Sequence, residues 1–188
     1  ACCLNSPPQH LESFLSSLIL DPQVSALSDG SDSDGGWVSS LDAGNVRAGY
    51  LAFGEPVTLR LWNTDFFGCV LPLRGRARLE QYPGAMQGQN GPFFLLPKSD
   101  QQWQLSGDCE LMVVRVSVDS TADARIRELL DQPRDRAGRN ECAQVMMKSL
   151  HYRLHHGLSY ADKLLLLQDI RKEFLQLFGF YPEPPGVA

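Results

Sequence analysis

Histidine is missing from the middle of this 188-residue chain, between Asn45 and Val118. Zinc, copper and non-haem iron sites in proteins commonly use imidazole ligands. A metal site built on this stretch would lack them, so we expect no metal and no cofactor there. The four histidines of the chain stand instead at His10, His151, His155 and His156.

Cysteine pairs, excess positive charge and long apolar runs are missing as well. None of the five cysteines forms a C-x-x-C pair, so a thiol-based metal or redox motif is not indicated. The formal net charge of −5 disfavours broad contact of this chain with nucleic acid. No apolar run reaches the ~18 residues of a membrane span, and the first residues lack the pattern of a secretory signal. We expect a cytoplasmic protein with no membrane contact.

The familiar catalytic motifs are also absent. No G-x-S-x-G nucleophile turn and no Gly-rich phosphate loop with its lysine occurs. His151 and His155 stand four residues apart, but "HYRLH" has Tyr152 where H-E-x-x-H has its glutamate. The spacing is that of two zinc ligands on one helix face, but without the glutamate we favour a solvated last turn, where cationic imidazoles suit the negative end of the helix dipole. We therefore predict no catalytic residues.

The first 36 residues are predicted to form a helix followed by a flexible connector. Apolar residues recur at helical spacing in "PPQHLESFLSSLIL", residues 7–20, and two prolines suit a helix entry. The polar, Gly-rich stretch "SDGSDSDGG", residues 28–36, then breaks the pattern.

Residues 45–118 are predicted to form an antiparallel barrel or jelly roll. Alternating apolar and polar residues indicate short strands joined by close turns. In "GCVLPLRGRARLEQYPG", residues 68–84, two strands around a tight turn are read as a hairpin, with Leu71, Leu73, Ala77 and Leu79 on one face. The predicted strands are 46–53, 57–62, 68–73, 76–82, 92–96, 101–106 and 109–118.

Residues 119–188 are predicted to be helical and to dimerise. Ser120 is a candidate cap, 133–139 a loop, and a helix over 141–156 ends before Gly157. Ser159 starts a last helix that packs antiparallel to it. The apolar face of the last helix is wider than one packing surface needs, which favours a dimer interface; burial within the monomer is the alternative. The predicted interface residues are Leu166, Ile170, Phe174 and Leu177.

The predicted barrel offers a small-ligand site. Arg60 and Trp62 lie on the same side of one strand, where an arginine can clamp a carboxylate and an indole can cover a flat ring. Trp103 is predicted to point inward, and Tyr50 offers a hydroxyl. For Arg60 and Trp62 an outer surface remains the alternative, with Leu59 and Leu61 facing the core.

The order of these segments resembles the N-terminal effector-binding and dimerisation domain of AraC/XylS-type transcription regulators. "VLPLRGRARLEQYPG" resembles that family's strand-turn-strand, and "GPFFLLPKSDQQWQLSGDCELMVVRVSVD" its following strands. The helix pair stands where the family has its dimerisation helices. The fold class expected is α+β, a cupin-like antiparallel barrel or jelly roll followed by an antiparallel helix pair.

The resemblance implies ligand sensing, homodimerisation and no catalysis. A small-molecule effector would bind in the barrel, with aromatic or aliphatic carboxylates as one candidate class. DNA would be contacted only through a C-terminal helix-turn-helix part that this sequence does not contain. The chain is therefore either part of a longer regulator or a stand-alone homologue.

Two alternatives remain at this point. One is a metal-free cupin-like enzyme, with Glu55, Glu80 and Glu110 as candidate titratable groups. The other is a protein-interaction module with a closed barrel. An open, lined cavity favours ligand sensing, whereas a packed interior favours the interaction module.

Overall fold

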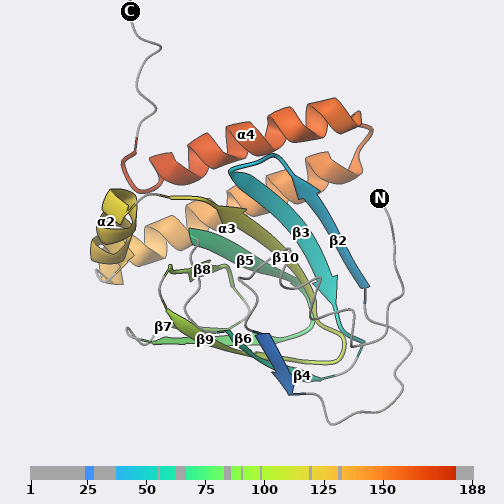
Figure 1. Ribbon diagram of the computed structural model, residues 1–188, viewed down its shortest axis with the longest axis vertical. Helices are drawn as coiled ribbons and strands as arrows, with labels where there is room; N and C mark the ends of the chain where they lie inside the picture. The colour runs from blue at the N-terminus through green and yellow to red at the C-terminus, as the bar shows by residue number, and fades with distance from the viewer. Residues whose placement is uncertain are drawn as a thin grey trace, which may run out of the picture.

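Two antiparallel sheets face each other, and helices cover the outer face of one of them (Figure 1). The computed structural model describes residues 24–27, 37–54, 56–61, 67–82, 86–89, 91–97, 99–118, 120–130 and 133–180. Within these ranges each sheet has five strands. This arrangement confirms the predicted fold class, an antiparallel cupin-like barrel combined with helices.

The strands of each sheet come from distant parts of the chain, as in a jelly roll. The first sheet has the order β1 (Val24–Leu27), β4 (Val57–Leu61), β9 (Asp100–Leu105), β6 (Ala77–Tyr82) and β7 (Met86–Gln89). The second has the order β2 (Trp37–Asp42), β3 (Val46–Ala52), β10 (Glu110–Val116), β5 (Phe67–Arg74) and β8 (Phe93–Leu95).

The second sheet is buried on both faces. Along β10, Met112 and Val114 belong to the cluster that packs under the helices. Leu111 and Val113 alternate with them and belong to the cluster between the two sheets. Because successive side chains point to opposite faces, the apolar run of β10 supplies two cores at once.

The predicted hairpin of residues 68–84 is wrong in one respect. Its two strands, β5 and β6, do not pair with each other but lie in different sheets. The turn at Gly75, with φ +70°, therefore carries the chain across the barrel. As a result Leu71 faces the helices, whereas Ala77 and Leu79 face the interior.

The sheets also begin earlier in the sequence than residue 45. The strands β1 and β2 form sheet edges beside β4 and β3, and β7 pairs with β6. These three strands were not predicted. The predicted helix over residues 7–20 and the connector over 28–36 lie outside the described residues.

Three helices follow the strands within the described part of the chain: α2 (Ser120–Leu130), α3 (Pro133–His155) and α4 (Tyr160–Gln176). The predicted loop at 133–139 is wrong, because α3 begins at Pro133, and proline is favoured in the first turn of a helix. The predicted cap of α4 is confirmed, since Ser159 accepts a hydrogen bond from the Asp162 amide. Helices α3 and α4 run antiparallel (Figure 1).

Aromatic rings hold the end of α4 against the sheet. Phe67 of β5 and Phe94 of β8 stack at 6.0 Å between ring centroids. Phe174 and Phe178 meet both of these rings edge to face. Edge-to-face and offset contacts of this kind add to the stabilisation from burial itself.

Candidate functional site

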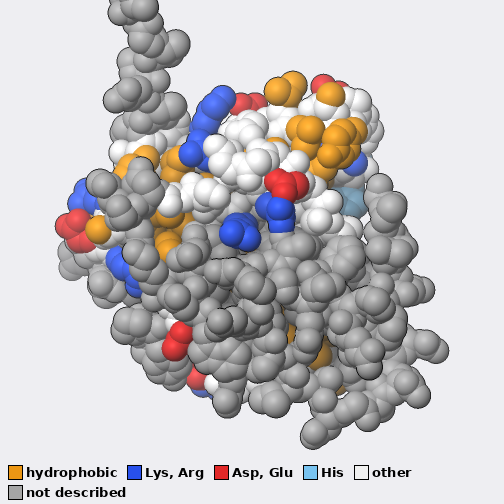
Figure 2. All heavy atoms as spheres, viewed as in Figure 1, with side chains coloured by type: hydrophobic (Ala, Val, Ile, Leu, Met, Phe, Trp, Pro, Cys, Tyr) orange, Lys and Arg blue, Asp and Glu red, His pale blue; other side chains and the backbone are white. Residues whose placement is uncertain are grey.

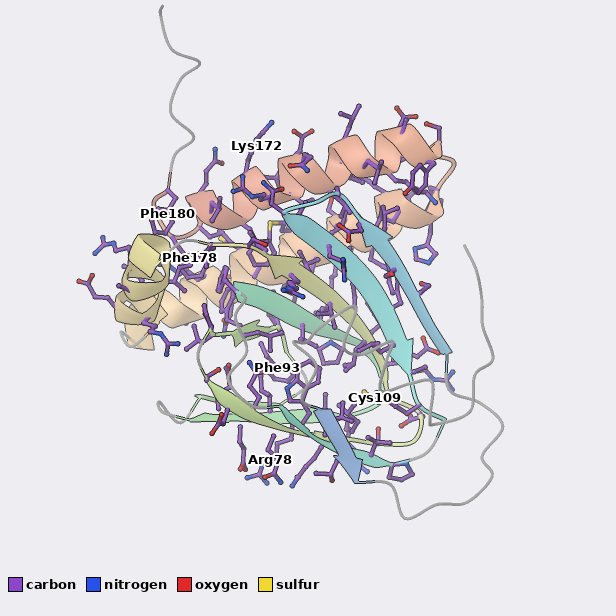
Figure 3. The ribbon with its side chains drawn as sticks, in the orientation of Figure 1. Arg78, Phe93, Cys109, Lys172, Phe178 and Phe180 are labelled. Carbon is purple, nitrogen blue, oxygen red and sulfur yellow. The ribbon has the colours of Figure 1, made fainter. Side chains whose placement is uncertain are left out.

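The space between the two sheets is the candidate site, and its end nearest Gly75 is filled with apolar side chains. Trp103 of β9 belongs to the apolar cluster between the sheets, and its side chain is 2% exposed. Figure 3 shows Phe93 pointing into this space, whereas Arg78 points away from it on the outer side of the first sheet. The gap around the indole does not admit a water molecule; it is lined by Val70, Ala77, Arg78, Leu79, Phe93, Trp103, Leu105 and Leu111.

Beyond Trp103 the interior becomes polar. The indole Nε1–H donates to Gln101 Oε1 at 3.1 Å, and Gln101 Nε2 donates to Ser99 Oγ at 3.3 Å. Gln81 of β6 donates to the Phe94 carbonyl at 2.6 Å and accepts from the Leu96 amide at 3.0 Å. Gln81 thus links the two sheets, and its buried amide is satisfied by backbone of the opposite sheet.

Two arginines lie side by side at this polar end. Arg47 of β3 stands directly opposite Arg115 of β10. Their neighbours Val46 and Val114 face the helices, so by alternation both arginines lie on the side of the sheet that faces the interior. Arg47 is paired with Asp42 of β2.

Glycines flank the arginine pair. Gly68 of β5 stands directly opposite Arg115 on its other side, and Gly49 of β3 stands opposite Val113. A Cβ atom on Gly68 would lie 2.6 Å from the Val114 carbonyl oxygen, so only glycine fits this close strand approach. The sheet surface beside Arg115 therefore carries no side chain from β5 at this level.

Sequence reasoning missed Arg47 and Arg115. A signal was present in "MVVRVSV", where one charged residue interrupts a buried run. A charged residue in a strand covered on both faces needs a partner or a ligand. Arg60 stands in a strand with clear alternation, which is the more readable pattern.

Tyr50 lies on the opposite face of the sheet from the interior. Its ring belongs to the cluster under the helices, and its hydroxyl lies 3.2 Å from His151 Nδ1 on α3. Burial raises the pKa of the Tyr50 hydroxyl. Burial, followed by the positive charge of His155, lowers the pKa of His151, whereas Glu110 acts in the opposite direction. Tyr50 therefore contributes to the sheet–helix contact.

Of the remaining predicted ligand residues, the structure places only the side chain of Trp103. Trp103 is in the interior, as described above. Arg60 lies in β4 level with Gln102, one position from Leu59, which packs in the interior; nothing is described of the Arg60 side chain. Trp62 lies outside the described residues.

Three of the four predicted interface residues are buried within the chain. Leu166, Ile170 and Phe174 of α4 are at most 3% exposed and pack on the second sheet. Leu177 is partly buried beside them. The wide apolar face of α4 is used inside the monomer, so a second copy of the intact fold cannot reach these three side chains.

Among the described residues, no three histidine, cysteine, aspartate or glutamate side chains are grouped so that they could hold a metal ion. His155 and His156 each direct Nδ1 toward the carbonyl oxygen four residues earlier in α3. In the same part of the chain, every helix is too short or too polar to cross a membrane.

Solved structures resemble the chain at low sequence identity. The AraC-like transcriptional activator CuxR matches 99% of this chain and 73% of its own, with 14% identity and a TM-score of 0.55. This likeness shows a shared fold. A cupin domain of Cnp3 from Schizosaccharomyces pombe matches 49% of this chain and 71% of its own, with 11% identity and a TM-score of 0.39.

Vicilin from Solanum lycopersicum matches 47% of this chain and 29% of its own, with 13% identity and a TM-score of 0.39. Among curated proteins no sequence matches significantly. A sequence model of one family matches residues 22–158, which is most of the chain. The chain therefore belongs to the AraC-binding-like domain family.

Proposed function

We propose that this chain is the effector-binding and dimerisation part of an AraC/XylS-type transcription regulator, located in the cytoplasm. The observation that carries the proposal is the family match over residues 22–158. In this role a small molecule binds between the two sheets, and DNA is contacted by a separate helix-turn-helix part. The net charge of −5 is consistent with this division, because DNA contact needs a basic surface.

The polar groups of the interior favour binding over catalysis. Gln81, Ser99 and Gln101 are the buried polar residues of the described part, and none of them titrates near neutral pH. Glu80 pairs with the exposed Arg78. Glu110 acts on the pKa of His151, on the helix side of the sheet. No carboxylate of the described residues is thus placed between the sheets beside Trp103 to serve as a general acid or base.

The polar end of the interior is the proposed place for the effector. The apolar end is packed around Trp103, whereas the level of Arg115 combines glycines, half-buried arginines and the glutamine network. A ligand bound here can act as a regulator only if it binds two states of the domain with unequal affinity.

A second candidate function is favoured by the packing around Trp103. The gap around the Trp103 indole does not admit a water molecule, as expected for an interaction module with a closed barrel. In that case the helices would bind a partner without any small molecule. The two candidates differ in whether the isolated chain binds a small ligand.

Dimerisation is proposed through the outer surface of the helix pair. Tyr152 of α3 and Tyr160 and Leu165 of α4 are each more than 60% exposed. Figure 2 shows apolar side chains gathered over the starting end of α4. Exposed apolar patches of this kind commonly mark protein interfaces, and the resemblance to AraC/XylS regulators indicates a second copy as the partner.

Calorimetry and thermal denaturation against a panel of small molecules test the effector role. The panel should contain aromatic acids, aliphatic acids, and neutral sugars and alcohols. The expected result is saturable binding of at least one compound, with a higher melting temperature because the ligand binds only the folded state. Absence of binding across the whole panel, together with a tight complex with another protein, would favour the interaction module.

A further inference from the structure

We propose that Arg47 and Arg115 form an anion-binding subsite, which takes the carboxylate or phosphate group of a small ligand with an apolar body. This inference rests on the proposed effector-binding function and adds to it the residues that recognise the acidic group of the ligand.

The first step of the argument is the register of β3 and β10. Arg47 and Arg115 are direct cross-strand partners, and such partners have Cβ atoms about 5 Å apart. Both residues are half-buried and lie on the interior-facing side of the sheet. Two guanidinium groups that start this close together can donate to the same anion.

The second step is the charge balance. Like charges on directly opposed strand positions disfavour each other. Asp42 offsets the charge of Arg47: these two side chains form an ion pair, with Asp42 44% and Arg47 28% exposed. Asp42 is also tied to the turn, since it accepts the Gly44 amide at 2.8 Å. The cross-strand pair thus brings two guanidinium groups to one place on the sheet.

Arg115 has interactions of its own within the chain. The proposal does not require this side chain to be unpaired. It requires that an anion be added to those interactions, or be exchanged for some of them, at a position that Arg47 also reaches.

The third step is the shape and polarity of the surroundings. Gly68 lies opposite Arg115, and Gly49 lies opposite Val113, two residues before Arg115. Because glycine has no side chain, nothing projects from the sheet at these two positions. Next to them Val70 and Val113 are buried and apolar. Partial burial strengthens charge-assisted hydrogen bonds relative to bulk water. An anion with a small aromatic or aliphatic body suits both the cationic and the apolar parts of this surface.

Three matched probes test the subsite by calorimetry on the full chain: benzoate, phenyl phosphate, and the neutral benzamide. We expect at least one of the two anions to bind, and benzamide to bind at least about tenfold more weakly, because it lacks the charge that the arginines recognise. The comparison of benzoate with phenyl phosphate distinguishes a carboxylate ligand from a phosphate ligand. Rising salt concentration should weaken binding of the anion.

Four variants assign the effect to residues. Arg115→Met and Arg47→Met should each weaken binding of the anion by about tenfold or more, and Arg115→Lys should restore part of it because it keeps the charge. Arg78→Met is the control, since Arg78 is an exposed arginine on the outer side of the first sheet, paired with Glu80. Urea unfolding of each variant confirms that the fold is retained.

Several outcomes would overturn the subsite. They are no saturable binding of either anion, equal binding of benzoate and benzamide, or unchanged affinity in folded Arg115→Met and Arg47→Met. A neutral sugar or alcohol that binds wild type and both variants alike overturns the subsite but leaves the effector function standing. Failure of the whole panel counts against both proposals.

Discussion

At the scale of single residues, Gln81 is the side chain whose replacement should cost most for its size. It is fully buried and bonds to the Phe94 carbonyl and the Leu96 amide of the opposite sheet. Gln81→Met keeps the approximate shape but leaves two buried backbone groups unpaired, so the free energy of unfolding should fall by about 3 kcal/mol. Urea denaturation measures this. Gln104→Met, at an exposed position of β9, should change little; equal midpoints would contradict the bridging role.

His151 predicts a pH dependence of stability. Its pKa in the folded chain lies below the ordinary value of 6.5, so the unfolded chain binds a proton more readily. Stability is therefore fully present above pH 6.5 and is lost as the pH falls from there toward the folded pKa. His151→Gln should reduce the difference between urea midpoints at pH 7.5 and 5.5. Ser149→Ala, at an exposed position of the same helix, should leave that difference as in wild type.

The residue scale also shows where sequence patterns stop being informative. Alternation along a strand separates two faces but does not say which face is the barrel interior when both are buried. Tyr50 and Leu51 are neighbours, and both are buried, yet one packs under the helices and the other between the sheets. Trp103 was placed correctly because its own sheet has one exposed face, marked by Gln104.

At the scale of elements, the turn between β5 and β6 predicts a contrast between two glycines. Gly75 and Gly44 both have positive φ, +70° and +78°, so alanine at either position should cost about 1 kcal/mol of backbone strain. A Cβ on Gly75 would also lie 2.6 Å from Cys109 Cα, whereas Gly44 faces open space. Gly75→Ala should therefore lower the free energy of unfolding by about 1–3 kcal/mol more than Gly44→Ala does, as measured by urea unfolding. Equal losses would show that the crossing turn can shift freely.

The last helix predicts a second contrast. Phe174 is fully buried against Phe67 and Phe94, so Phe174→Ala should destabilise the fold by about 3–5 kcal/mol. Leu165 of the same helix is 65% exposed. Leu165→Ala should therefore lower the free energy of unfolding by less than about 0.5 kcal/mol. Chemical denaturation of both variants measures the contrast. Similar losses of stability in the two variants would contradict the burial of Phe174 and the exposure of Leu165 on α4.

Helices and strands could be predicted from the sequence where the residue types and the spacing of apolar residues indicate the same structure. The apolar runs of β5 and β10 and the capped start of α4 follow directly from local preferences. The strands β2 and β7 were missed because "WVSSLD" and "MQGQ" have little apolar alternation; pairing with a neighbouring strand makes them strands. The first turns of α3 were missed because "PRDRAGR" is polar and contains a glycine, and helix propensity alone is a weak guide.

At the scale of the whole molecule, the chain builds one sheet with a core on each side. The interior of the barrel and the contact under the helices share β3, β5 and β10. A ligand at Arg115 and a partner on the helices would therefore act on opposite faces of the same strands. This shared sheet is a short physical route by which the proposed effector could influence the proposed dimer.

The dimer itself gives the last prediction. Leu165→Glu combined with Tyr152→Glu places two charges on the exposed outer surface of the helix pair, and it should yield a folded monomer. Lys172→Glu, an exposed change farther along α4 (Figure 3), should stay dimeric. Phe174→Glu should unfold the chain, because that side chain is buried in the monomer. Sedimentation velocity and circular dichroism distinguish these results; a wild-type chain that sediments as a monomer, or a double variant that remains a dimer, contradicts an interface on this surface.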